Sequence, residues 1–412
     1  DADLRKIMLI AFLLRMLGSV GYSLMVQYYY GYGDTFTFYY GSNFLRDHVL
    51  QNTDNIKYFF SSAADFKNWF DMEVGDINYS GYFGVASNLF VMKISAVVSF
   101  LSFNCFLIIS VIFGFFSFAG QWRMFQVFND INKGKQQKLL AWAVLYTPSI
   151  WFWGSGLMKD SVCIGALGFI IHYLYKIFIK KEVKLKDLII LFILLYIVSQ
   201  IKSYIIIILA ITFATTALST FISSIKNIII KALVLLIFLF TTLLIAFVTN
   251  FSEQMQEFGE EAMTQIDSFK HGYEALQNAE EDSEGGLKTI QRDISLQGLI
   301  IQSPLAIFTC LYRPFVWESR KLIILLTSFE SLLLLLSTIF VIIKTGIFKF
   351  FRLLFIDPYI LFACLASLLF ALLIGLTTFN FGTMIRYKII LLPFFYFMLV
   401  RYYTYATDKN TT

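Results

Sequence analysis

Long runs of apolar residues alternate with shorter polar stretches along the whole chain of 412 residues. A run of about 20 apolar residues has the length that a helix needs to cross roughly 30 Å of hydrocarbon. We expect membrane spans at residues 7–26, 85–119, 139–153, 161–178, 188–200, 205–222, 228–249, 322–343, 354–377 and 389–403. The strands of a membrane barrel would be shorter and strictly alternating, and the chain does not show that pattern. The sequence therefore predicts an all-α polytopic membrane protein with about ten transmembrane helices, forming a single transmembrane domain over residues 1–412.

Two long polar segments interrupt the apolar pattern, at residues 27–83 and 250–303. The first contains a short helical stretch at 39–49 and an amphipathic stretch at 56–70, whose aromatic side chains suit the surface of a bilayer. The second is rich in Asp and Glu, and its first half has a helical pattern. Residues 304–317 are apolar but are broken by Arg313-Pro314, so we expect a re-entrant or interfacial piece there.

The composition agrees with a membrane protein, and the charges are sorted between the loops. Only 15% of the residues are charged and 58% are hydrophobic, whereas soluble domains carry about 25% charged residues. Lys and Arg gather in the short loops, around Lys138, Lys184, Lys226 and Lys349, while Asp and Glu gather in the two long polar segments. The positive-inside rule then places both long segments outside the cytoplasm. The net charge of +5 says little, because the charges are sorted by side of the membrane. No nucleic-acid partner is expected, and the four cysteines have neither metal-site nor disulfide spacing.

The first candidate for chemistry is Asp34, in the stretch Tyr28-Tyr-Tyr-Gly-Tyr-Gly-Asp34 that follows directly on the first apolar run. Tyrosine favours the membrane–water boundary because its ring is apolar and its hydroxyl prefers water. Gly31 and Gly33 allow a sharp turn that brings Asp34 back over the helix end. An acid at this level could act as a base toward a donor anchored in lipid. The alternative is an aromatic belt with a solvated aspartate, and this stretch alone favours the belt.

A tight outer hairpin is predicted between the third and fourth spans. Pro148 begins it, Gly154-Ser-Gly156 forms its turn, and Lys159-Asp160 opens the next helix. We expect Asp160 or Ser161 to cap that helix, whose free N–H groups attract anions. Capping alone would account for Asp160. Lys159 is costly at this depth unless it has a partner.

Further cations are expected at the same outer level. Lys202 ends the short fifth span, Arg313 is flanked by aromatic residues, and Arg386-Tyr387-Lys388 opens the last helix, with Pro393 inside it. Each cation alone fits a side chain that reaches for the headgroups as well as it fits a functional group. Together they lie on the face where the positive-inside rule depletes Lys and Arg, and this favours phosphate binding.

In this order the motifs resemble those of the GT-C superfamily of integral-membrane glycosyltransferases, which use polyprenyl-phosphate-linked donors. The resemblance rests on Gly33-Asp34…Tyr39-Tyr40, the long first outer loop, Pro148…Ser155…Asp160, Lys202 between two short helices, and Arg386-Tyr387…Pro393. It implies that Asp34 is the catalytic base and that Arg386, Lys202 and Arg313 hold the lipid phosphate. It also places Lys159, Asp160, Tyr39, Tyr387 and Lys388 among the substrate-binding residues.

The segments Arg-Pro-Phe…Trp-Glu and Gly-Thr…Arg-Tyr-Lys resemble those of bacterial surface-polysaccharide assembly proteins, polymerases among them. This resemblance implies a multi-pass protein of the bacterial cytoplasmic membrane, surrounded by membrane lipid, with its active site on the extracytoplasmic face. The acceptor would be a glycan or a lipid-linked molecule. Two features depart from the GT-C pattern: Thr35 follows Asp34 where many members have a second acid, and residues 250–303 have no counterpart.

One carboxylate placed as a base, without a nucleophile partner, predicts transfer with inversion. No cofactor is expected, and no carboxylate cluster demands a divalent metal. The alternative class is a transporter or flippase for lipid-linked oligosaccharides, which would show paired repeats and broken helices near the bilayer midplane. A third class is a membrane scaffold that uses the acidic outer segments as docking surfaces.

Overall fold

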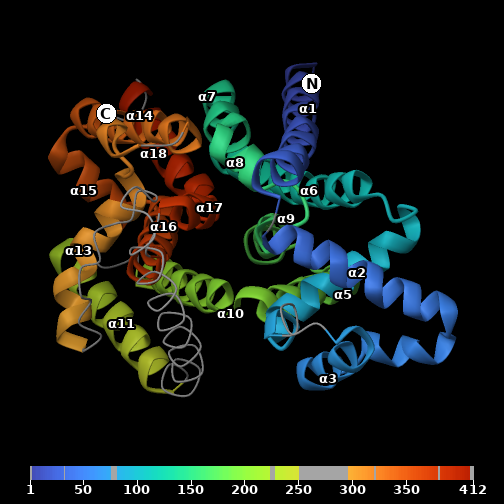
Figure 1. The fold of residues 1–412 in the computed structure, drawn as a ribbon. Helices are drawn as coiled ribbons and strands as arrows, with labels where there is room; N and C mark the ends of the chain where they lie inside the picture. Colours follow the sequence, from blue (N-terminus) through green and yellow to red (C-terminus); the bar gives the residue numbers. More distant parts are fainter. Residues whose placement is uncertain are drawn as a thin grey trace. The chain divides into compact units, whose positions relative to one another are not determined.

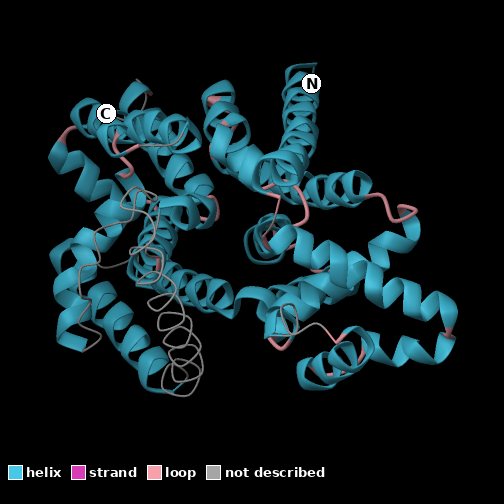
Figure 2. Cartoon of the chain, in the orientation of Figure 1, coloured by secondary structure: helices cyan, strands magenta, loops and turns pink. Residues whose placement is uncertain are grey.

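The computed structural model describes residues 2–31, 33–75, 81–222, 228–249, 296–319, 322–378 and 381–408. All regular secondary structure in these ranges is helical, and no strand occurs in them (Figure 2). The all-α prediction is therefore confirmed for the described part of the chain. Of the acidic segment predicted at 250–303, residues 250–295 lie outside the described residues, and a helix begins at Leu296.

Six helices are long and apolar enough to cross a membrane, which supports a membrane-embedded protein. They are Ala2–Tyr30, Phe106–Ile131, Lys159–Ile179, Leu185–Phe221, Leu322–Thr345 and Pro358–Thr377. A seventh span would be formed by α17 (Phe381–Lys388) and α18 (Leu392–Thr407), which are bent by 60° relative to each other. The clear spans among the described residues are thus fewer than the ten that the apolar runs predict.

The helices differ from the predicted spans at three breaks. The apolar run 85–119 is divided into α5 (Ala86–Leu101) and α6 (Phe106–Ile131), because Phe103 and Asn104 between them have positive φ angles of 50° and 60°. The run 139–153 is divided before Pro148, whose ring excludes Thr147 from the helical region (φ −56°, ψ 122°). The runs 188–200 and 205–222 share α10 (Leu185–Phe221), which leaves helical geometry at Lys202.

The first of two compact units comprises Asp1–Ile207 and Arg386–Thr404. Its centre is the close contact of α6 with α9 (Lys159–Leu174), where a Cβ added to Gly168 would lie 2.0 Å from the carbonyl oxygen of Gly120. Around this contact, α1 (Ala2–Met25) packs on α6, and α2 (Asp34–Gln51) packs on α5 (Figure 1). The N-terminal part of α18 returns to α6, with the rings of Phe128 and Phe397 stacked at 4.2 Å.

A buried arginine ties three segments of this unit together. Arg15 in α1 is 2% exposed and donates hydrogen bonds to Ser117 Oγ at 2.8 Å, to the Gly154 carbonyl at 2.7 Å and to the Gln121 side chain. No carboxylate among the described residues lies within ion-pair distance of it. The guanidinium of Arg15 therefore has neutral oxygens as its hydrogen-bond partners. Its bond to the Gly154 carbonyl fixes the turn that leads into α9.

The second unit comprises Ile208–Ile385 and Tyr405–Thr412. In it α13 (Leu296–Tyr312) packs closely on α16 (Pro358–Thr377), and a Cβ on Gly375 would meet the Ala306 carbonyl at 2.2 Å. The other helices of the unit are α11 (Ile228–Thr249), α14 (Leu322–Thr345) and α15 (Ile347–Ile356), with α15 in contact with the other two and with α16. Most of the stretch predicted as re-entrant, 304–317, belongs to α13.

Candidate functional site

The sequence positions Asp34 through two glycines. The chain turns after α1 at Gly31 (φ +68°) and at Gly33 (φ +116°), in conformations that residues with a Cβ rarely adopt. The sharp turn predicted there is therefore confirmed, although Tyr32 itself lies outside the described residues. The following helix, α2, begins at Asp34, earlier than the helix predicted at 39–49. The Asp34 side chain, in the first turn, is 47% exposed.

Asp160 lies in the first turn of α9 and is fully buried. The helix begins two residues before the predicted span, with Met158 in the capping position, where its side chain makes no capping hydrogen bond. The capping role predicted for Asp160 or Ser161 is therefore wrong. The carboxylate of Asp160 instead accepts from Lys202 Nζ at 2.5 Å and from Arg386 Nε at 3.4 Å.

Lys202 and Arg386 reach Asp160 from two breaks in helical geometry. Lys202 is the non-helical residue of α10 (φ −147°, ψ 78°), so the prediction of a lysine between two helical pieces is confirmed. Arg386 lies in the last turn of α17, just before the 60° bend into α18. Pro393, expected inside the last helix, is the second residue of α18, where a missing N–H costs little. Tyr387 packs beside both cations, with Lys202 Nζ 4.0 Å from its ring centroid.

We call Asp34, Arg386, Asp160 and Lys202 the ionic cluster. Their charges alternate: Asp34 lies 3.4 Å from Arg386 Nη2, Arg386 contacts Asp160, and Asp160 contacts Lys202. Burial differs along the series, from the 47% exposed side chain of Asp34 to the fully buried side chain of Asp160. The cluster thus presents one accessible carboxylate beside a guanidinium, and its interior is neutralised by a buried pair.

Tyrosines complete the surroundings of Asp34. Burial, together with the charge and hydrogen bond of the neighbouring Asp34 carboxylate, raises the pKa of the Tyr82 hydroxyl above its usual range. The Tyr82 phenol therefore stays protonated and can orient Asp34. The hydroxyl of Tyr22 lies 2.9 Å from Thr35 Oγ1, next to the same carboxylate in sequence.

The remaining predicted site residues of the first unit have other partners. Lys159 donates to Ser87 Oγ at 2.7 Å. Tyr39 donates to the Asn104 carbonyl at 2.8 Å, and its ring packs on Phe106, so these contacts are with the α5–α6 connection and with α6. Lys388 is only 1% exposed. Of the residues expected to bind substrate, the structure therefore gathers Asp160, Lys202, Arg386 and Tyr387 around Asp34.

Arg313 belongs to the second unit, and its guanidinium has a carboxylate partner there. Its Nε donates to Glu318 Oε1 at 3.0 Å, and its Cζ lies 5.3 Å from the ring centroid of Phe381. Burial acts to raise the pKa of Glu318, but hydrogen bonds from Arg313 and from the Phe315 backbone hold it below its ordinary value. Arg313 is thus paired within one short turn of the chain.

No motif in the sequence predicted a role at the site for Tyr22, Thr35, Tyr82 or Ser87. Tyr82 lies at the end of the first polar segment, as Tyr28 lies at its beginning. This symmetrical placement is a signal that could have indicated that Tyr82 lies at the level of Asp34. Ser87, one turn further on, had no such signal, because an isolated serine at a helix start is usually a cap.

In the part of the chain that is described, no three side chains of His, Cys, Asp or Glu are grouped so that they could hold a metal ion. No protein-family model, no curated protein and no solved structure matches the chain. The geometry of the ionic cluster and its tyrosines is therefore the basis for assigning a function.

Proposed function

We propose that the chain is a membrane glycosyltransferase that moves a sugar or oligosaccharide from a polyprenyl-phosphate-linked donor to a glycan or lipid-linked acceptor. The reaction would take place on the extracytoplasmic face of a bacterial cytoplasmic membrane, and a polysaccharide polymerase is one form of it. One observation carries the proposal: an exposed carboxylate, Asp34, lies 3.4 Å from a guanidinium, Arg386, at the end of an apolar helix. A base and a phosphate-binding group are the two parts that such a transfer needs.

In this mechanism Asp34 accepts the proton of an acceptor hydroxyl as the hydroxyl oxygen attacks the anomeric carbon. The bond from that carbon to the phosphate oxygen breaks, and the electron pair leaves with the polyprenyl phosphate. Arg386 binds the phosphate through its planar fork and stabilises the charge that grows on it. The donor phosphate takes the place of the Asp34 carboxylate on Arg386, which releases Asp34 to act as a base.

Asp160 and Lys202 have a different role in this proposal. Both are buried, and their contact of 2.5 Å is the shortest in the cluster, so they position Arg386 and Tyr387. Lys159, whose ammonium lies on Ser87, is available as a second cation for the phosphate. Since Asp34 is the only exposed carboxylate of the cluster, direct displacement with inversion is the expected course.

The decisive variant is Asp34→Asn. The amide keeps the shape of the carboxylate but cannot accept a proton at neutral pH, so transfer should fall by about 10² to 10⁴-fold while donor binding persists. The measurement uses purified protein in vesicles with labelled polyprenyl-phosphate-linked sugars extracted from bacterial membranes. Transfer appears as label that leaves the lipid-extractable fraction, together with free polyprenyl phosphate.

Asp47→Asn is the matched control, because Asp47 is also on α2 and its side chain is 52% exposed. It should leave turnover unchanged, as most exposed surface substitutions do. Wild-type turnover in Asp34→Asn would remove Asp34 from the chemistry. A wild-type protein that moves lipid-linked oligosaccharide across the bilayer without releasing polyprenyl phosphate would instead support a flippase.

A further inference from the structure

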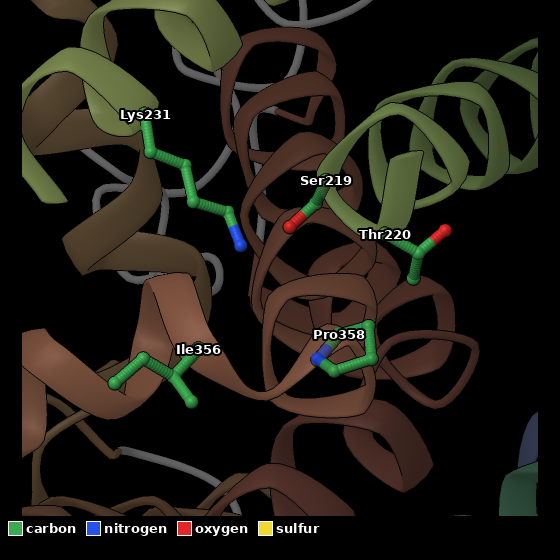
Figure 3. Close-up of a pocket in the computed structure, with 5 residues that line it drawn as sticks. All are labelled: Ser219, Thr220, Lys231, Ile356 and Pro358. Carbon is green, nitrogen blue, oxygen red and sulfur yellow. The ribbon is translucent and has the colours of Figure 1, made fainter. Parts of the chain in front are cut away.

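The second unit contains a cavity of about 260 Å³. Its lining residues come from three regions of the chain: Ser219 and Thr220 from the end of α10, Lys231 from the first turn of α11, and Ile356 and Pro358 from the junction of α15 and α16 (Figure 3). One water molecule takes roughly 30 Å³ of liquid volume. The cavity is therefore large enough for a phosphate group with some of its hydration.

Lys231 brings a positive charge into this cavity, and no described residue brings a negative charge to match it. The residue is 8% exposed, and its ammonium has no hydrogen-bond or ion-pair partner among the described residues. Figure 3 shows the ammonium of Lys231 and the hydroxyl of Ser219 pointing toward each other across the cavity. A largely buried lysine favours an anionic partner for its ammonium. None of the described residues supplies that anion.

The neighbouring polar groups do not supply that anion. Thr220 points away in Figure 3 and donates its hydroxyl to the Ala217 carbonyl at 2.7 Å. Asp357, between the lining residues Ile356 and Pro358, is engaged elsewhere. One of its oxygens caps α16 through the Tyr359 and Ile360 amides, and the other accepts from the Tyr405 hydroxyl at 2.8 Å. Lys231 and Ser219 are thus the two donors available to a ligand.

Exposed apolar side chains on the helices that line the cavity indicate that the anion belongs to a lipid. Ile356, which lines the cavity, is 52% exposed, and on the same helices Phe221, Ile229 and Phe348 are exposed by 84%, 68% and 89%. α15 combines such apolar side chains with Lys349 and Arg352 and buries only Leu353. A helix of this kind lies in the boundary between headgroups and acyl chains. An anion held at the cavity would then have acyl chains as neighbours.

We propose that Lys231 and Ser219 bind the phosphate group of an anionic phospholipid, with the acyl chains against the exposed apolar side chains of α10, α11 and α15. The ammonium of Lys231 makes a charge-assisted hydrogen bond to one phosphate oxygen, and the hydroxyl of Ser219 donates to another. This inference does not depend on the proposed glycosyl transfer. A soluble phosphate ester has the same binding chemistry, and the experiment separates the two sources.

The test measures lipid binding to the purified full-length protein in detergent, by native mass spectrometry and by thermal shift. The probes are phosphatidylglycerol, phosphatidylcholine and inorganic phosphate. The wild type should prefer phosphatidylglycerol. Lys231→Met should weaken that binding by about ten- to a hundredfold, the usual value of a hydrogen bond to a charged group. Ser219→Ala should weaken it less, and it serves as a second test if Lys231→Met does not fold.

Lys344→Met is the matched control, since Lys344 is an exposed lysine in the last turn of α14 in the same unit. It should keep the wild-type preference for phosphatidylglycerol. Without lipid, Lys231→Met should unfold at the same temperature as the wild type or higher, because it removes a charge that lacks a partner. Equal lipid affinity in Lys231→Met and Lys344→Met would overturn the site. Protection of the wild type by inorganic phosphate, but not by phosphatidylglycerol, would overturn the lipid as its occupant.

Discussion

Asp34 and Asp160 share one arginine but lie in different surroundings. Asp160 is fully buried and also contacts Lys202 at 2.5 Å, while Asp34 is half-exposed and contacts Arg386 at 3.4 Å. Coulomb interactions are stronger where water is excluded, and exposed pairs are screened. The same residue type can therefore serve stability at position 160 and the proposed proton transfer at position 34.

The two aspartates should differ in their effect on stability. Asp160→Asn leaves Lys202 buried without its carboxylate and should lower the free energy of unfolding by about 3 to 5 kcal/mol. Asp34→Asn removes only an exposed partner of Arg386 and should cost less than about 1 kcal/mol. Thermal unfolding of the two variants in detergent measures this difference.

A double variant, Asp160→Leu with Lys202→Met, provides the control for that prediction. Replacing both members of a buried pair by apolar groups is often neutral, so this protein should regain most of the stability that Asp160→Asn loses. Equal losses in Asp34→Asn and Asp160→Asn would contradict the distinction between the two carboxylates.

At the scale of residues, the sorting of charges predicted which side chains lie together, but the sequence did not predict the direction in which a side chain leaves its helix. Asp160, Lys202 and Arg386 could be expected to lie together, because all were costly charges at one predicted membrane level. Tyr39 was expected among them, but its hydroxyl contacts Asn104. Its direction depends on where α2 begins, and the helix predicted at 39–49 began five residues too late. The capping role of Asp160 failed for a similar reason, a shift of two residues at a helix start.

At the scale of elements, glycines set the distance between α6 and α9. Gly120 and Gly168 let the two backbones approach until no Cβ fits between them. Small residues at such contacts are typical of helices that pack in membranes, where close van der Waals contact replaces the hydrophobic driving force.

Gly168→Ala should therefore destabilise the first unit. The new Cβ would lie 2.0 Å from the Gly120 carbonyl oxygen, a backbone atom, so the helices have to move apart. We expect a loss of about 1 to 3 kcal/mol in the free energy of unfolding. Gly81→Ala is the comparison, because a Cβ there meets nothing within 4 Å. A loss in Gly81→Ala as large as in Gly168→Ala would show that the contact is not responsible.

Apolar runs predicted the helical class well and the helix limits less well. Hydropathy cannot detect the break at Phe103 and Asn104, because both lie within an otherwise apolar run and only their φ angles end the helix. It did separate two helical pieces at Lys202, where α10 leaves helical geometry. The helix break before Pro148 could have been predicted, since the residue before a proline avoids helical geometry.

At the scale of the whole molecule, the sorting of charges predicts which loops share a side of the membrane. A cysteine at Asn52 should react with a membrane-impermeant thiol reagent added to intact cells, and one at Lys184 should not. Both positions are exposed in the structure. Cys105, which is also exposed, has to be replaced by serine first.

The reagent should label both cysteines once the cells are opened, which controls for their reactivity. Labelling of Lys184→Cys but not of Asn52→Cys in intact cells would reverse the predicted orientation and would place Asp34 on the cytoplasmic side.

Arg15 has a consequence for how this protein is made. A ribosome synthesises α1 long before the partners of its arginine exist, since Ser117 follows 102 residues later and Gly154 follows 139 residues later. An arginine near the centre of a newly inserted helix costs roughly 2.5 to 3.5 kcal/mol on insertion scales. Until those segments arrive, the first helix carries that cost alone. Whether this helix stays in the bilayer therefore depends on segments that are synthesised after it.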